Sequence, residues 1–238
     1  MYQFDSKVRY SEVDANRELT WSALLNYFQD CSVFQSESLG RGIEYLAKNH
    51  QAWILSSWQI CLNRMPKLAE RITVSTWPYE MKAFYGYRNF CMDAEDGTRL
   101  AYANSMWVLM DTQSGRPIKV SDEITDAYGM EPALPMERMG RKISIPQDMK
   151  EVRSLVVPKD FIDTNQHMNN EKYVMLAMEF LPEGFTVGQL RAEYRREAHL
   201  GDTICISVSE QQDTFTVLLA GEDGKPYAVV EMSCNGVG

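Results

Sequence analysis

The sequence lacks a long hydrophobic segment and a surplus of basic charge. Hydrophobic residues make up 45% of its 238 residues, but no apolar run reaches the roughly 18 residues that a membrane-spanning helix needs. The formal net charge is -9, whereas binding to nucleic acid phosphates requires a dense basic face. We therefore expect a protein that neither crosses a membrane nor binds nucleic acid.

A local metal-binding pattern and a targeting signal are also absent from the sequence. The five cysteines are odd in number, widely spaced and never form a CxxC motif, so we interpret them as buried, reduced thiols. The three histidines, His50, His167 and His199, are too far from the cysteines in sequence for a local zinc pattern. We expect no metal site and no cofactor. The first residues carry neither a basic nor an apolar segment, which predicts a cytoplasmic protein without a secretory signal.

Two copies of one pattern organise the chain. The first copy has the segment DANRE at 14–18, and the second has DTNQH at 163–167. Each segment is followed by apolar residues at helical spacing, over 21–31 in the first copy and 173–180 in the second. Thr20 can cap the first predicted helix, and Asn169 or Asn170 the second.

Segments rich in aromatic and β-branched residues follow each predicted helix and indicate strands. They lie at 53–62, 72–79, 87–94 and 100–111 in the first copy, and at 187–195, 203–209, 215–220 and 227–234 in the second. A Glu-Asp-Gly turn separates two strands in both copies, and Asp-Gly favours a hairpin. Each copy thus predicts an α+β domain with one helix wrapped by an antiparallel sheet. Pairing of the two sheets into one continuous sheet would cover their open edges.

The segment between the copies has the composition of a connector. Residues 115–150 contain four prolines and show little periodicity, apart from a possible short helix around 121–128. We predict an N-terminal domain at 1–114 with a degenerate site, a connector at 115–150, and a C-terminal domain at 151–238 with the active site.

The two copies differ at residues that can do chemistry. The second copy has the pattern D-x-N-x-H at Asp163, Asn165 and His167, whereas the first has Glu18 in place of the histidine. A second difference lies further along the chain, in the segment EYRRE at 193–197. If Leu200 is aligned with Leu68, the last glutamate of this segment, Glu197, corresponds to a methionine of the first copy. These differences predict a single active site in the second copy, with the first copy supplying a wall.

The motif at Asp163, Asn165 and His167, followed by Asn169, Asn170 and Tyr173 and then by EYRRE at 193–197, resembles the acyl-acyl carrier protein (acyl-ACP) thioesterase family of bacteria and plants. The resemblance covers nearly the whole chain. It implies a tandem hot-dog fold and hydrolysis of fatty acyl-ACP thioesters in fatty acid biosynthesis, with acyl carrier protein as the partner. It also implies a catalytic set of Asp163, Asn165, His167 and Glu197. Plant members carry a cysteine where this chain has Ala198, and we interpret that cysteine as dispensable because the other motif residues are present.

The chemistry of a thioester fits these residue types. Hydrolysis requires a polarised carbonyl and a deprotonated water, and Glu197 is the expected general base. Direct attack by Glu197 through an anhydride is the alternative, and the sequence does not separate the two. Asn165 would hold the water or the carbonyl, His167 would orient Glu197 or donate a proton, and Asp163 would fix the histidine tautomer or the turn. Free N–H groups at the start of the following helix would suit an oxyanion.

Other interpretations of the same residues stay open. Asp and Asn before a helix commonly serve as caps, Glu197 could form an ion pair with the adjacent arginines, and we interpret His50 and His199 as structural. The alternative functions are an acyl-CoA thioesterase of the same fold and a non-catalytic module that binds acyl chains. A monomer and a homodimer are both compatible with a tandem chain. Basic residues near the connector could dock an acidic carrier protein: Arg138, Arg141, Lys142, Lys150, Arg153 and Lys159.

Overall fold

The computed structural model describes residues 1–234 and divides the chain into two compact units. The first unit comprises residues 1–56 and 62–138, and the second comprises residues 57–61 together with the chain from Met139 onward. Within residues 1–234, no helix is long and apolar enough to cross a bilayer.

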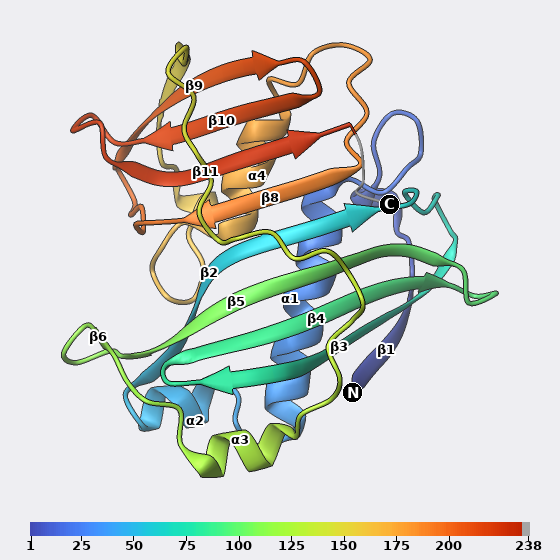
Figure 1. Cartoon of the computed structure of the whole chain (residues 1–238), viewed down its shortest axis with the longest axis vertical. Coiled ribbons are helices and arrows are strands. Elements are labelled where there is room, and N and C mark those ends of the chain that lie inside the picture. The colour runs from blue at the N-terminus through green and yellow to red at the C-terminus, as the bar shows by residue number, and fades with distance from the viewer. Residues whose placement is uncertain (235–238) are drawn as a thin grey trace. The chain divides into compact units, whose positions relative to one another are not determined.

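The first unit is a mainly antiparallel sheet with one long helix against it (Figure 1). Its strands follow the order β1-β3-β4-β5-β2, with β6 beside β5. The pairs β1–β3, β3–β4 and β4–β5 are antiparallel, and α1 contacts β3 and β1. The elements are β1 (Tyr2–Lys7), η1 (Tyr10–Glu12), α1 (Trp21–Ser38), α2 (Ile43–Lys48), β2 (Gln51–Leu62), β3 (Arg71–Lys82), β4 (Tyr85–Ala94), β5 (Arg99–Asp111), β6 (Arg116–Pro117) and α3 (Asp122–Tyr128).

Helix α1 forms where the sequence predicts it. The Thr20 side chain accepts a hydrogen bond from the Ala23 N–H at 3.2 Å and caps the helix. The predicted apolar face is buried, with Leu24, Phe28 and Cys31 fully shielded from solvent. Burial of this stripe against the sheet gives the unit its core, because each large side chain removed from water contributes about 1.5–3 kcal/mol.

The second unit repeats this plan with a shorter helix. Its strands follow the order β2-β8-β11-β10-β9-β7, and residues 57–61 of β2 pair antiparallel with β8. Helix α4 contacts β11 (Figure 1). Strand β2 is divided between the two units, with residues 57–61 in the second. The elements are β7 (Lys150–Val156), η2 (Lys159–Phe161), α4 (Asn170–Met178), β8 (Gln189–Tyr194), β9 (Thr203–Gln211), β10 (Thr214–Ala220) and β11 (Pro226–Ser233).

Some local expectations are wrong. Phe180 was expected on the second helix, but α4 ends at Met178; Pro182 follows closely and disfavours a helical conformation in the residue before it. Cys31 is buried, which raises the pKa of its thiol to about 12. Cys234, by contrast, is exposed because it lies beyond the end of β11. The thiols are free, as predicted, but they are not all buried.

Candidate active site

Asp163 shapes the turn that precedes α4. Its Oδ1 accepts hydrogen bonds from the backbone N–H groups of Asn165 at 2.8 Å and His167 at 3.4 Å. Asp14 makes the same two contacts in the first unit, at 2.8 and 3.0 Å. Of the two roles expected for Asp163, the geometry therefore supports the one in the turn: it positions His167 through the backbone.

The predicted correspondence between the two copies is confirmed by backbone hydrogen bonds. The Met168 N–H donates to the Ala198 carbonyl at 2.7 Å, as the Leu19 N–H donates to the Pro66 carbonyl at 2.9 Å. The residue before each acceptor is Glu197 in the second copy and a methionine in the first. The same backbone framework therefore carries a carboxylate beside a histidine in only one copy.

His167 and Glu197 come together in the second unit. The His167 Nε2 atom lies 3.1 Å from the Glu197 Oε2 atom, and the side chains are 27% and 43% exposed. The pair combines residues 30 positions apart (197 - 167). A carboxylate next to an imidazole, both within reach of solvent, is an arrangement suited to proton transfer.

The two arginines before Glu197 are engaged elsewhere. Arg195 Nη2 lies 2.7 Å from the buried carboxylate of Glu193. Arg196 Nη1 lies 2.9 Å from Asp223 Oδ2, and its guanidinium stacks over an aromatic ring. The alternative interpretation of Glu197 as the ion-pair partner of these arginines is therefore wrong, since both have other carboxylates.

A buried tyrosine supports the segment that carries Glu197. The Ala198 N–H donates to the Tyr173 hydroxyl at 3.0 Å, and Tyr173 is only 2% exposed. Burial raises the pKa of Tyr173 well above its usual value, so the hydroxyl stays neutral. The Ala198 side chain is fully buried. A cysteine at this position would lie in the interior, whereas the Glu197 carboxylate reaches solvent.

The start of α4 offers fewer free donors than expected. The Asn169 side chain caps the helix and accepts the Glu171 N–H at 3.1 Å. The Lys172 N–H donates to the Asn169 carbonyl at 2.9 Å. These two N–H groups are therefore unavailable to an oxyanion. Asn165 is exposed in the preceding turn, where its proposed contact with substrate stays a prediction.

His199, which the sequence alone leads us to interpret as structural, lies beside the predicted pair in the structure. Its ring packs edge-on against His167, with 4.9 Å between the ring centroids and an interplanar angle of 87°. Ligand atoms of His167, Glu197 and His199 all lie within 4.8 Å of one another. The spacing of two residues between Glu197 and His199 was a usable signal, because alternate residues of an extended segment face the same side.

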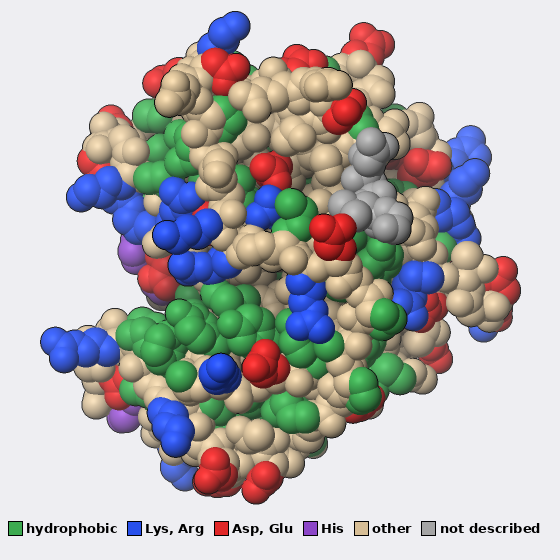
Figure 2. Space-filling view, in the orientation of Figure 1, with side chains coloured by type: hydrophobic (Ala, Val, Ile, Leu, Met, Phe, Trp, Pro, Cys, Tyr) green, Lys and Arg blue, Asp and Glu red, His purple; other side chains and the backbone are tan. Residues whose placement is uncertain are grey.

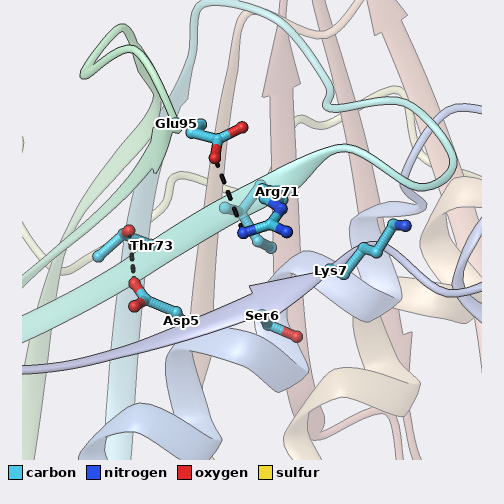
Figure 3. Close-up of a pocket in the computed structure, with 7 residues that line it drawn as sticks. Asp5, Ser6, Lys7, Arg71, Thr73 and Glu95 are labelled. Carbon is cyan, nitrogen blue, oxygen red and sulfur yellow. Dashed lines mark hydrogen bonds and ion pairs between the residues drawn. The ribbon is translucent and has the colours of Figure 1, made fainter.

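A surface pocket in the first unit lies among other residues. It is lined by β1 and β3, where Thr73 Oγ1 donates to Asp5 Oδ1 at 2.7 Å and Arg71 lies 3.7 Å from Glu95 (Figure 3). These polar groups satisfy one another, and the four predicted catalytic residues are not among those that line the pocket. The pair of His167 and Glu197 belongs to the second unit.

Both halves of the chain match models of one protein family. Residues 1–128 match the acyl-ACP thioesterase N-terminal domain, and residues 146–232 match the C-terminal domain. The chain belongs to the acyl-ACP thioesterase family. The second match contains the turn at Asp163, the helix α4 and the segment with Glu197.

Relatives of this acyl-ACP thioesterase family member include plant enzymes and bacterial proteins of known structure. The chain is 29% identical to the chloroplastic acyl-acyl-carrier-protein hydrolase FATB3 of Cuphea viscosissima, over 93% of this chain and 59% of the relative. A crystal structure of an acyl-ACP thioesterase from Bacteroides thetaiotaomicron has a TM-score of 0.89 at 24% identity, covering 97% of this chain and 96% of the other. A putative oleoyl thioesterase from Lactobacillus plantarum has a TM-score of 0.85 at 25% identity, covering 97% and 94%.

These comparisons confirm the tandem hot-dog fold, because the structural matches extend over nearly the whole chain. The chain spans 52–59% of the length of the three Cuphea viscosissima hydrolases that it matches.

Proposed function

We propose that this protein hydrolyses fatty acyl-ACP thioesters to a free fatty acid and acyl carrier protein, in fatty acid biosynthesis. The contact of 3.1 Å between His167 Nε2 and Glu197 Oε2 carries the proposal. It is supported by the family match, since the relatives in Cuphea viscosissima are named acyl-acyl-carrier-protein hydrolases.

In the proposed reaction, Glu197 removes a proton from a water that attacks the thioester carbonyl. His167 orients the Glu197 carboxylate, or passes to the leaving thiolate the proton that Glu197 took from the water, and Asn165 holds the water or the carbonyl. The leaving thiol has an ordinary pKa of about 8.5, so its departure needs no strong acid. Attack by Glu197 itself through an anhydride is the second possible course.

Asp163 completes the proposed set as a positioning residue. Its carboxylate holds the backbone of the turn that carries Asn165 and His167.

The catalytic set lies in the second copy of the repeat. We therefore propose a degenerate domain at 1–114, a connector at 115–150 and the working domain at 151–238. The cytoplasmic location and the monomeric or homodimeric state stay predictions.

Acyl carrier protein is the proposed partner, and docking requires local basic groups despite the net charge of -9. Figure 2 shows Lys and Arg side chains reaching solvent on the visible face, interspersed with acidic ones. Of the six basic residues near the connector, Arg153 is compensated by Glu179 at 2.6 Å, and Arg138 stacks over Tyr79 with 4.6 Å to the ring centroid. A docking role therefore rests more on Lys142, Lys150 and Lys159.

The test is a substrate panel. Fatty acid release would be measured from acyl-ACPs of increasing chain length and from the matching acyl-CoAs at equal concentrations. We expect higher kcat/KM for carrier-linked substrates, and the best chain length identifies the preferred acyl group. Turnover of CoA esters alone would contradict the proposed partner. Binding of acyl chains without any turnover would contradict hydrolysis.

A further inference from the structure

We propose that His167, Glu197 and His199 form a binding site for a divalent transition-metal ion of the Zn²⁺ type, and that a bound ion blocks hydrolysis. The second half of this inference rests on the proposed function, because it requires that His167 and Glu197 act on the thioester. The first half is a statement about binding and stands independently.

The donor set and its spacing suit such an ion. Two imidazoles and one carboxylate are a known ligand set for a zinc ion that keeps a fourth position open. A zinc ion about 2.0–2.2 Å from each ligand holds tetrahedral donors roughly 3.4 Å apart. The ligand atoms here lie within 4.8 Å of one another, with 3.1 Å between His167 Nε2 and Glu197 Oε2. The side chains are partly exposed, so modest rotations can complete the geometry.

A carboxylate near His199 holds its backbone and lies close to its ring. Asp202 Oδ2 accepts the His199 backbone N–H at 2.8 Å and lies 3.7 Å from the His199 Nδ1 atom. A small rotation that closes this gap would let Asp202 accept a proton from Nδ1, and Nε2 would then be free to bind a metal. The Ala198 N–H, between Glu197 and His199 in sequence, is held by the Tyr173 hydroxyl.

The first unit provides an internal contrast. At the positions that correspond to His167, Glu197 and His199, it has Glu18, Met65 and Lys67. A lysine ammonium repels a cation, and methionine is not among the usual zinc ligands, which are Cys, His, Asp and Glu. Two of the three histidines of the chain thus meet in one unit, together with a carboxylate.

Metal binding and the proposed chemistry are mutually exclusive. A carboxylate that coordinates a metal cannot accept the proton of the attacking water, and a coordinated imidazole nitrogen can neither hold Glu197 nor donate a proton. Occupancy therefore lowers kcat in proportion to the fraction of protein that carries the ion.

Isothermal titration calorimetry with ZnCl₂ on chelator-treated protein tests the site. All proteins would carry Cys234→Ser, which removes an exposed thiol that would otherwise bind zinc. We expect one site per chain, at least tenfold weaker in His199→Gln and unchanged in His50→Asn. His50 is the matched control because it is the one remaining histidine, and asparagine tolerates its left-handed backbone, φ 54°. Equal zinc affinity in the His199→Gln protein and its parent, or no binding in the parent, would overturn the site.

Hydrolysis of acyl-ACP measured with and without ZnCl₂ tests the exclusion. The product is followed as free fatty acid, since zinc also binds the released thiol. We expect saturating zinc to lower the rate at least tenfold, and half-inhibition to require at least tenfold more zinc in His199→Gln. Zinc binding without an effect on the rate, or with a faster rate, would overturn the exclusion. Zinc binding in a protein that never hydrolyses acyl-ACP would support the site and overturn the proposed function; hydrolysis without zinc binding would do the reverse.

Discussion

Tyr173→Phe should weaken the support of the segment that carries Glu197 while leaving the packing of α4 intact. The Tyr173 hydroxyl accepts the buried Ala198 N–H at 3.0 Å. Phenylalanine keeps the ring, so the loss is confined to one oxygen, and a buried N–H without its partner costs about 1–3 kcal/mol. In a chain of this size each kcal/mol lowers Tm by about 2–4 °C. We therefore expect Tm to fall by roughly 2–12 °C.

The same substitution should lower kcat, because Ala198 follows Glu197 directly. Each 1.4 kcal/mol of lost transition-state stabilisation corresponds to about a tenfold slower reaction. Thermal unfolding and acyl-ACP hydrolysis would be measured together for native protein, Tyr173→Phe and the control Tyr27→Phe. The Tyr27 hydroxyl donates to Glu12 at 2.8 Å in the first unit, so the control should lose stability but keep kcat. An unchanged Tm and kcat in Tyr173→Phe, or equal losses of kcat in both variants, would refute the argument.

Three further predictions concern neighbouring residues. Glu171→Leu should raise Tm at pH 8, because Glu171 is buried with one oxygen unpartnered and burial raises its pKa. The gain in Tm over native protein should shrink as the pH falls through that raised pKa, because the native carboxyl becomes neutral. A gain in Tm that grows toward acid pH would contradict this prediction. Ala198→Cys should leave kcat within about twofold of native protein while costing up to about 1–3 kcal/mol in an unfolding titration, since this side chain is fully buried; a large rise in kcat would show that the family cysteine matters. Asp163→Asn should keep most of kcat, because an amide oxygen can accept the two backbone N–H groups of the turn, whereas Asp163→Ala should lower kcat roughly tenfold. Equal losses of kcat in the two variants, measured in steady-state assays, would indicate that the negative charge is needed.

The fold was largely predictable because both copies carry strong local signals. The periodic apolar face of α1 and its cap at Thr20 coincide with the observed helix. The Asp-Gly turns at 96–97 and 223–224 connect strands in both units, with Gly97 and Gly224 at the positive φ values, 82° and 72°, that such turns favour. The end of α4 was less predictable, since apolar spacing continued to Phe180 while the nearby proline limited the helix.

The candidate site was predictable only in part. The difference between the copies pointed to His167 and Glu197, which the structure brings to 3.1 Å. Whether Glu197 meets an arginine or a histidine depends on which carboxylates the arginines contact: Arg195 contacts Glu193, two residues before it, and Arg196 contacts Asp223, 27 residues further along the chain. The contact of His199 with His167 brings together residues 32 positions apart (199 - 167), so the sequence carries only one local sign of it, the spacing of two residues between Glu197 and His199.

In the proposed reaction, the carboxylate of Glu197 in the second unit drives hydrolysis of acyl-ACP. The most direct measurement is kcat on the best acyl-ACP for native protein, Glu197→Gln and the matched variant Glu18→Gln. Glu18 occupies the turn of the first unit at the position that corresponds to His167, so its substitution removes a carboxylate of the degenerate copy. We expect Glu197→Gln to lower kcat at least a hundredfold, within the range of general-base catalysis of about 10²–10⁴, with the native Tm retained and Glu18→Gln within about twofold of native protein. A folded Glu197→Gln variant with native kcat, or an equal loss in Glu18→Gln, would contradict the account.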